Sequence, residues 1–349
     1  MMRTGEVGQV ISFANWPEYI DRDPADPAQP PTLAEFTRRS GIPVSYSEPI
    51  TDNEQFFARI GVPLARRESI GYDLIVLSDW TVAQVGGMGW ARPFRPDVVP
   101  NAANLLPAIR ESPLASVLDY SLPWQAGLTG IGYNLAATGR PVTSMTDLLT
   151  APDLRGRVAL VSEMRDVMGL LLLDRGHDPA AFTSAEFDLT LESLESSVRS
   201  GQIRTVTNRY RAGLARGDIA ACVGWSGDVL SLGRADPRIQ FAIPPSGALL
   251  WTENLMIPAY ADNPEGAERL IDYYYQPDVA ARLAVSQLFT CPVEGASEVL
   301  PEDAPGLSDH ERRYVFPPPE VLSACHVFRN LTPVESSVLT DKYVSAVGL

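Results

Sequence analysis

The stretch YDLIVLS, residues 72–78, is a short apolar run that ends in a polar residue, a pattern typical of a buried β-strand. Similar runs occur at residues 9–13, 44–47, 158–161, 220–224 and 239–243. Between these runs, helical periodicity marks residues 32–40, 53–64, 145–150, 166–175, 185–200, 208–216, 264–275 and 277–286. Strands that alternate with helices predict an α/β protein with mainly parallel sheets.

The length of the chain predicts two lobes. With 349 residues and 38.0 kDa, the chain exceeds the usual size of a single hydrophobic core. We expect one lobe to comprise residues 6–122 and 252–292 and the other to comprise residues 123–251 and 293–349. Ligands of open α/β sheets bind at the carboxyl ends of strands, so a ligand cleft is expected between the lobes.

The composition narrows the possible partners. A net charge of −15 argues against nucleic acid as a partner and favours a cationic or neutral ligand. Lys342 is the single lysine, which removes Schiff-base and Walker-type chemistry from consideration. No apolar run approaches the length of a bilayer span of about 18 residues, so membrane attachment is expected only through a lipid anchor or a membrane partner.

The termini and the cysteines leave alternatives open. The residues after Met1 lack the apolar core of a signal peptide, which fits either a trimmed mature chain or a cytoplasmic one. Three cysteines match no zinc or thioredoxin spacing, and we expect no metal and no cofactor. Cys222 is expected to be a buried strand residue, and a disulfide between Cys291 and Cys325 remains open.

Aromatic and acidic residues gather directly after several of the expected strands. There are five such groups. They consist of Trp16, Glu18 and Tyr19; of Asp79 and Trp80, which follow Ser78; of Glu163 and Asp166; of Trp225 and Asp228; and of Trp251 and Glu253. An alkylammonium ligand needs aromatic faces for its methylene groups and anions for its charged ends. Each group alone also fits an ordinary half-buried residue at a lobe edge.

Glu163 and Asp166 have two compatible interpretations. A spacing of three residues at the start of a helix places both carboxylates on one face, where they form an acidic pair. The same positions suit first-turn acidic residues, because the helix dipole favours negative charge there and lowers the pKa of a carboxyl.

Six blocks in the same order carry a resemblance to a known family. They lie at residues 11–20, 72–78, 130–134, 223–229, 251–259 and 276–280. In these blocks the chain resembles the spermidine/putrescine-binding receptors of bacterial transport systems along nearly its full length. The resemblance implies a two-lobed type II periplasmic-binding fold, in which each lobe is a mainly parallel sheet flanked by helices.

The resemblance also implies which residues bind the ligand. They are Trp16, Tyr19, Ser78, Glu163, Asp166, Trp225, Asp228, Trp251 and Glu253, and we add Glu18 and Phe289 as further candidate ligand-binding residues. Phe289 stands where a tyrosine hydroxyl often meets the ligand in this family. Arg329 falls near a position that is usually uncharged, so it is either paired internally, which we favour, or faces the ligand.

The implied function is that of an extracytoplasmic receptor rather than an enzyme. Such a receptor binds a polyamine by lobe closure and delivers it to the permease of an ABC transporter, as a periplasmic or lipid-anchored monomer. Another organic cation or an amino acid derivative is the alternative ligand. A hydrolase is the weaker alternative, because the segment at 224–228 resembles a nucleophile elbow but lacks its final glycine, and the three histidines lie in polar stretches.

Overall fold

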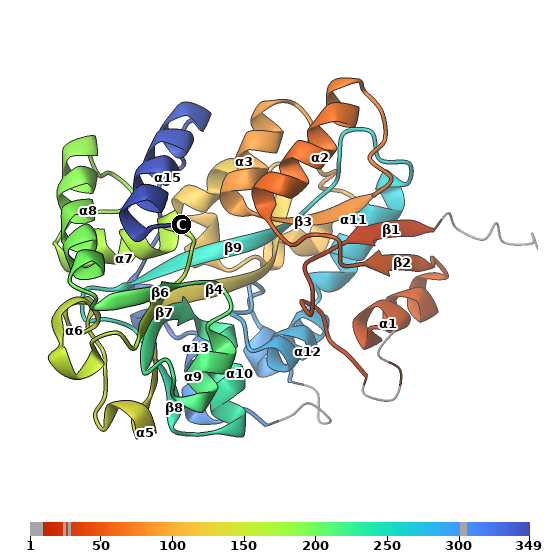
Figure 1. The fold of residues 1–349 in the computed structure, drawn as a ribbon. Helices are drawn as coiled ribbons and strands as arrows, with labels where there is room; N and C mark the ends of the chain where they lie inside the picture. Colours follow the sequence, from red (N-terminus) through yellow and green to blue (C-terminus); the bar gives the residue numbers. More distant parts are fainter. Residues whose placement is uncertain (1–9, 24–25, 27–28, 301–305) are drawn as a thin grey trace, which may run out of the picture. The chain divides into compact units, whose positions relative to one another are not determined.

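The computed structural model describes residues 10–23, 26, 29–300 and 306–349, so residues 6–9 of the expected first lobe lie outside the described residues. The chain forms two compact units, and Figure 1 labels their helices and strands. Unit 1 comprises Met1–Ala126, Thr252–Gln287 and Cys291–Leu307, and unit 2 comprises Gly127–Trp251, Leu288–Thr290 and Ser308–Leu349. The chain passes from unit 1 to unit 2 within strand β4 (Ser121–Asn134) and returns within β9 (Ala248–Met256).

These bounds differ from the expected ones over three short segments, at residues 123–126, 288–290 and 293–307. Aromatic packing explains the first difference, because the Trp124 ring lies 4.4 Å from the ring of Tyr274 in unit 1. A β-bridge explains another, because Val293 pairs with Leu105 of the same unit. Such contacts between residues far apart in the chain leave no local signal in the sequence.

Unit 1 is built on a sheet of mainly parallel strands. Its strands are β1 (Ile11–Ala14), β2 (Val44–Ser47), β3 (Leu74–Ser78) and the second half of β9. β1 runs parallel to β2 and β3, and β9 pairs antiparallel with β3. The helices are α1 (Pro31–Ser40), α2 (Asn53–Ala65), α3 (Asp79–Gly87), α4 (Pro107–Arg110), α11 (Pro264–Tyr274) and α12 (Pro277–Gln287).

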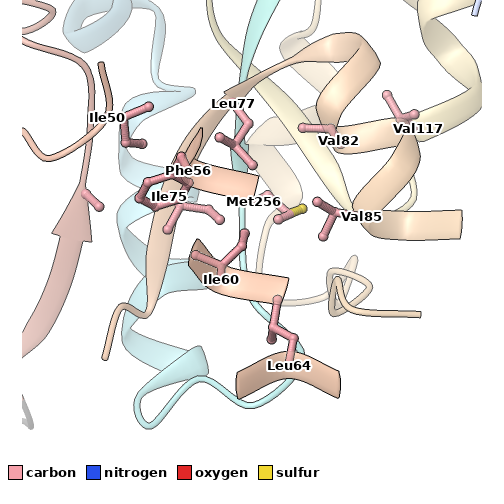
Figure 2. Close-up of a cluster of buried hydrophobic side chains, with 11 residues drawn as sticks. Ile50, Phe56, Ile60, Leu64, Ile75, Leu77, Val82, Val85, Val117 and Met256 are labelled. Atoms are coloured by element: carbon pink, nitrogen blue, oxygen red, sulfur yellow. The ribbon is translucent and has the colours of Figure 1, made fainter. Parts of the chain in front are cut away.

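The core of unit 1 explains why the run at 72–78 decides the fold. Alternate residues of β3, Ile75 and Leu77, pack against apolar residues of α2 and α3 (Figure 2). The intervening residues Leu74 and Val76 are also fully buried. Both faces of this strand are therefore covered, and the sequence of such a strand is apolar at successive positions rather than at alternate ones.

Unit 2 contains a mixed sheet. Its strands are the rest of β4, β5 (Val158–Leu160), β6 (Ile203–Val206), β7 (Ala221–Trp225), β8 (Ile239–Ala242), the first half of β9 and β10 (Cys325–His326), which runs parallel to β9. β5 runs parallel to β6 and β7, and β4 pairs antiparallel with both β7 and β8. The helices are α5 (Leu135–Thr138), α6 (Met145–Thr150), α7 (Met164–Asp174), α8 (Ser184–Arg199), α9 (Arg211–Arg216), α10 (Ser226–Ala235), α13 (Asp309–Val315), α14 (Pro319–Leu322) and α15 (Pro333–Val347).

The structure answers the open question of the disulfide between Cys291 and Cys325. All three cysteines are free, so Cys291 and Cys325 form no disulfide, and Cys222 is buried in β7 as expected. Among the helices that the structure describes, none combines the length and the apolarity that a bilayer crossing requires.

Gln125 of β4 is an unusual polar residue in unit 1, and it supports a stability prediction. Its side chain is 1% exposed, and neither its amide oxygen nor its nitrogen has a hydrogen-bond partner among the described residues. Because an unsatisfied buried polar group destabilises a fold by about 1–3 kcal/mol, we expect Gln125→Met to raise the free energy of unfolding. Denaturant titration measures this change.

Gln202 provides the matched control for this substitution. It is also buried, but its Nε2 donates to the carbonyls of Leu148 and Ala151, at 3.1 and 3.0 Å. Gln202→Met is therefore expected to lower the free energy of unfolding. An equal loss of stability in both variants would show that the Gln125 amide is satisfied in solution.

Candidate ligand-binding site

In unit 1, the centre of the candidate site is the carboxylate of Glu253. This residue of β9 lies directly opposite Ser78, the last residue of β3. The carboxylate accepts a hydrogen bond from the Ser78 hydroxyl and another from the indole Nε1 of Trp16, at 2.9 Å. Three of the predicted residues, which come from three separate blocks of the sequence, are thus brought together.

Asn53 is a residue of this site that the sequence did not reveal. Its Nδ2 donates to the Ser78 hydroxyl at 2.8 Å, and its Oδ1 accepts from the Ser78 backbone N–H at 3.3 Å. The hydroxyl of Ser78 is therefore held between Asn53 and Glu253. From the sequence, Asn53 appears only as one of the polar residues that begin a helix.

A tight turn after β1 orients Trp16. The buried side chain of Asn15 accepts from the Trp16 N–H at 2.8 Å and donates to the Tyr19 carbonyl at 3.2 Å. Glu18 adopts a left-handed conformation with φ of 58°, and it is exposed. Tyr19 is 8% exposed, so the two predicted residues of this turn differ sharply in their access to solvent.

In unit 2, the corresponding centre is the carboxylate of Asp166. It accepts from the Thr129 hydroxyl at 2.5 Å and from the indole Nε1 of Trp225 at 3.2 Å. Thr129 and Trp225 are paired residues of the neighbouring strands β4 and β7. Asp166 therefore points toward the sheet from the first turn of α7.

The net shift of the Asp166 pKa is opposite to the lowering that we expect from the helix dipole alone. Burial raises the pKa of the Asp166 carboxyl, although the hydrogen bonds from Thr129 and Trp225 and the charge of Arg165 act in the opposite direction. Removal from water disfavours the charged form, and this effect exceeds the combined stabilisation by the two hydrogen bonds and by Arg165. A cation bound beside Asp166 would lower the pKa of this carboxyl and favour its ionised form.

Trp225 and Asp228 are fixed by Tyr210, a fully buried residue that the sequence did not single out. The Tyr210 hydroxyl accepts from the Trp225 N–H at 2.9 Å and donates to the Asp228 carboxylate at 3.2 Å. Gly224 makes this approach possible, since a Cβ there would lie 3.0 Å from the hydroxyl oxygen.

Glu163 precedes α7 as its N-cap residue, without a capping hydrogen bond from its side chain. Its carboxylate instead accepts from Asn208 Nδ2 at 3.3 Å. Asn208 in turn accepts from the backbone N–H of Ser162 at 2.8 Å. Glu163 and Asp166 thus have different partners, and Glu163 lies next to the loop that precedes α9.

Trp251 and Phe289 form an aromatic pair in unit 2. Their rings are 5.8 Å apart at an angle of 64°, and each ring lies against a glycine. A Cβ on Gly127 would come within 2.2 Å of the Trp251 ring, and one on Gly227 would come within 2.6 Å of the Phe289 ring. The indole Nε1 of Trp251 is buried and has no hydrogen-bond partner among the described residues.

Arg329 is paired internally, as we favoured from the sequence. Its guanidinium lies 3.1 Å from the Glu335 carboxylate and 4.5 Å from the centre of the Phe182 ring. A backbone hydrogen bond from Thr332, together with the bond from Arg329, lowers the pKa of Glu335 to about 2. The charge of Arg329 is therefore matched by a carboxylate in the same unit.

Comparison with known proteins identifies the family. The family model described as bacterial extracellular solute-binding protein matches residues 32–304. The chain belongs to this family. The spermidine/putrescine-binding periplasmic protein of Escherichia coli K12 is 30% identical over 296 residues, which cover 83% of this chain and 79% of that protein. The resemblance seen in the sequence is thereby confirmed.

Solved structures show the same fold. The spermidine/putrescine ABC transporter substrate-binding protein PotD from Streptococcus pneumoniae has a TM-score of 0.81 at 20% identity, over 97% of this chain and 98% of that one. The TpPotD lipoprotein of Treponema pallidum has a TM-score of 0.80 at 19% identity, over 97% and 99% of the two chains. The predicted type II periplasmic-binding fold is confirmed.

Proposed function

We propose that this member of the solute-binding family binds a linear polyamine of the putrescine or spermidine type and delivers it to the permease of an ABC transporter. One observation carries the proposal: each unit holds a carboxylate that accepts a hydrogen bond from a tryptophan indole N–H. The pairs are Trp16 with Glu253 in unit 1 and Trp225 with Asp166 in unit 2. A linear diamine has the matching chemistry, with an ammonium group at each end.

The two pairs suit ammonium groups for a physical reason. A carboxylate held by neutral donors such as indole N–H and hydroxyl groups offers remaining lone pairs to a cation. The indole ring beside it presents a negative face, and a cation over such a face gains about 0.5–2 kcal/mol. The aromatic pair of Trp251 and Phe289 adds apolar surface for the methylene groups.

The proposal includes the remaining features of this family of receptors. The ligand is bound in a cleft between two lobes that close around it, with the other predicted residues, Glu18, Tyr19 and Glu163, contributing to the cleft. The chain acts outside the cytoplasm, in the periplasm or on a lipid anchor, as the names of its relatives suggest for those proteins. It acts as a monomer and has no nucleic-acid partner.

No catalytic step is part of the proposal. The residue in the nucleophile position of the elbow-like segment, Ser226, is fully buried, and its Oγ accepts from the Leu128 N–H at 3.2 Å. A nucleophile elbow requires an exposed hydroxyl at a strained turn. This geometry supports binding rather than ester or amide hydrolysis.

Calorimetry with a matched set of amines tests the proposal. We expect putrescine to bind at least tenfold more tightly than butylamine, which has the same carbon chain but a single ammonium group, because only the diamine engages both carboxylates. We also expect small-angle scattering to show compaction on binding. Equal affinities for the two amines would contradict the proposal, and preferential binding of 4-aminobutyrate would favour an amino acid derivative as the ligand.

A further inference from the structure

The loop before α9 contacts three of the predicted binding residues of unit 2. Asn208 donates to Glu163, and Tyr210 contacts both Trp225 and Asp228 through its hydroxyl. The next residue, Arg211, is the first residue of α9 and is also directed at Asp228. None of these loop residues belongs to the predicted set.

Both carboxylate oxygens of Asp228 are engaged within unit 2. The Arg211 guanidinium lies 3.7 Å from Oδ1, and the Tyr210 hydroxyl donates to Oδ2 at 3.2 Å. Arg211 also donates to the hydroxyl of Ser231, one turn further along α10, at 3.4 Å. Arg211 therefore spans the first two turns of α10 and is held there by two contacts.

The negative charge of Asp228 is compensated by the neighbouring guanidinium of Arg211. Asp228 lies 3.7 Å from the permanently charged guanidinium of Arg211. The Asp228 side chain is 18% exposed and that of Arg211 is 43% exposed, so water screens their attraction only in part. The pair is close to neutral for an approaching cation.

We propose that Arg211 is a specificity-determining residue that withholds Asp228 from cationic ligands. A ligand ammonium at Asp228 has to approach Arg211, and the repulsion offsets the attraction of the carboxylate. The chain therefore discriminates against an amine whose additional ammonium group reaches Asp228. This inference rests on the proposed function and names one determinant of its ligand preference.

Removal of the Arg211 charge is expected to widen the ligand preference. In Arg211→Gln, the guanidinium charge that faces Asp228 is removed, while the hydrogen bond from the Tyr210 hydroxyl is kept. We expect the affinity for spermidine, which carries a third ammonium group, to rise about tenfold or more, and that for putrescine to rise less. Arg211→Lys keeps the positive charge and is expected to retain the preference of the parent chain.

A double-mutant cycle separates this role from a structural one. We expect Asp228→Asn to weaken spermidine binding at least ten times more in the Arg211→Gln background than in the parent chain, because Asp228 contacts the ligand only after Arg211 is removed. Arg216→Gln is the matched control, since Arg216 ends the same helix and pairs with Asp218 at 2.7 Å, where both side chains are 65% exposed. This control is expected to change no affinity.

The outcomes distinguish this inference from the proposed function. If the parent chain binds neither putrescine nor spermidine, the proposed function fails. If it binds them and Arg211→Gln leaves the ratio of the two affinities unchanged, or if Asp228→Asn weakens binding equally in both backgrounds, the role of Arg211 is overturned. Circular dichroism and thermal unfolding of each variant verify that the differences arise in a folded protein.

Discussion

Glu253→Gln is expected to weaken putrescine binding by about 30-fold or more. The substitution keeps the size of the side chain but removes the anion that pairs with one ammonium end. Loss of one partner of a desolvated ion pair costs about 2–5 kcal/mol, and 1.4 kcal/mol corresponds to a factor of ten. The new amide N–H₂ replaces one of the two acceptor oxygens, so either the Ser78 hydroxyl or the Trp16 Nε1–H loses its acceptor. Titration calorimetry measures the loss.

Glu265→Gln is the control for net charge in the same unit. The Glu265 side chain is 66% exposed and lies 3.2 Å from Arg95, within a surface ion pair. Surface pairs of this kind contribute little to stability, and we expect the variant to bind putrescine like the parent chain. If Glu253→Gln and Glu265→Gln bind equally well, Glu253 is not an ammonium acceptor.

Asp166→Asn is expected to produce a loss of similar size and to remove most of the pH dependence of binding. Because burial raises the pKa of Asp166, this carboxyl takes up a proton at a higher pH than an ordinary aspartate does. Amine binding requires the ionised form, so the affinity of the parent chain falls as the pH is lowered through this raised pKa. Calorimetry at a series of pH values measures the dependence.

The raised pKa of Asp166 also affects the stability of the unliganded protein, with the opposite dependence on pH. A carboxyl with a raised pKa in the folded state stabilises that fold at low pH, and this contribution is lost as the pH rises through the folded-state pKa. Asp166→Asn is therefore expected to be folded and at least as stable as the parent chain at neutral pH. Thermal unfolding verifies this before binding is compared.

Asp218→Asn provides the matched comparison for Asp166. It removes one negative charge from the same unit at a side chain that is 65% exposed and paired with Arg216. We expect this variant to keep the affinity and the pH dependence of the parent chain. If Asp166→Asn retains the full pH dependence, another group controls the ionisation that accompanies binding.

Some elements of the fold were predictable because their signals are local. The apolar run at 72–78 gave β3, and the capped periodic segment at 185–200 gave α8, whose capping box joins Thr183 and Glu186. The 14-residue strand β4 was missed because glycines interrupt it. A Cβ on Gly130 would lie 2.7 Å from the Phe241 ring and from a backbone carbonyl, so the glycine is required by packing that the sequence does not display.

The start of α9 shows the same limit. Helical periodicity predicted a helix from residue 208, but α9 begins at Arg211. Residues 208–210 remain outside the helix, where Asn208 and Tyr210 direct their side chains to partners in other elements. Tertiary hydrogen bonds therefore decide this boundary rather than helix propensity.

The sequence by itself determined the fold class and the family, because apolar runs, block order and residue types are local properties. It placed a carboxylate beside four of the six tryptophans along the chain, as with Trp16 and Glu18 or Trp225 and Asp228. Only the tertiary structure decided the actual partners, which join Trp16 to Glu253 and Trp225 to Asp166. The physical reason is that strand pairing and helix packing bring residues of separate blocks to one edge of a sheet, while neighbours in a turn point in different directions.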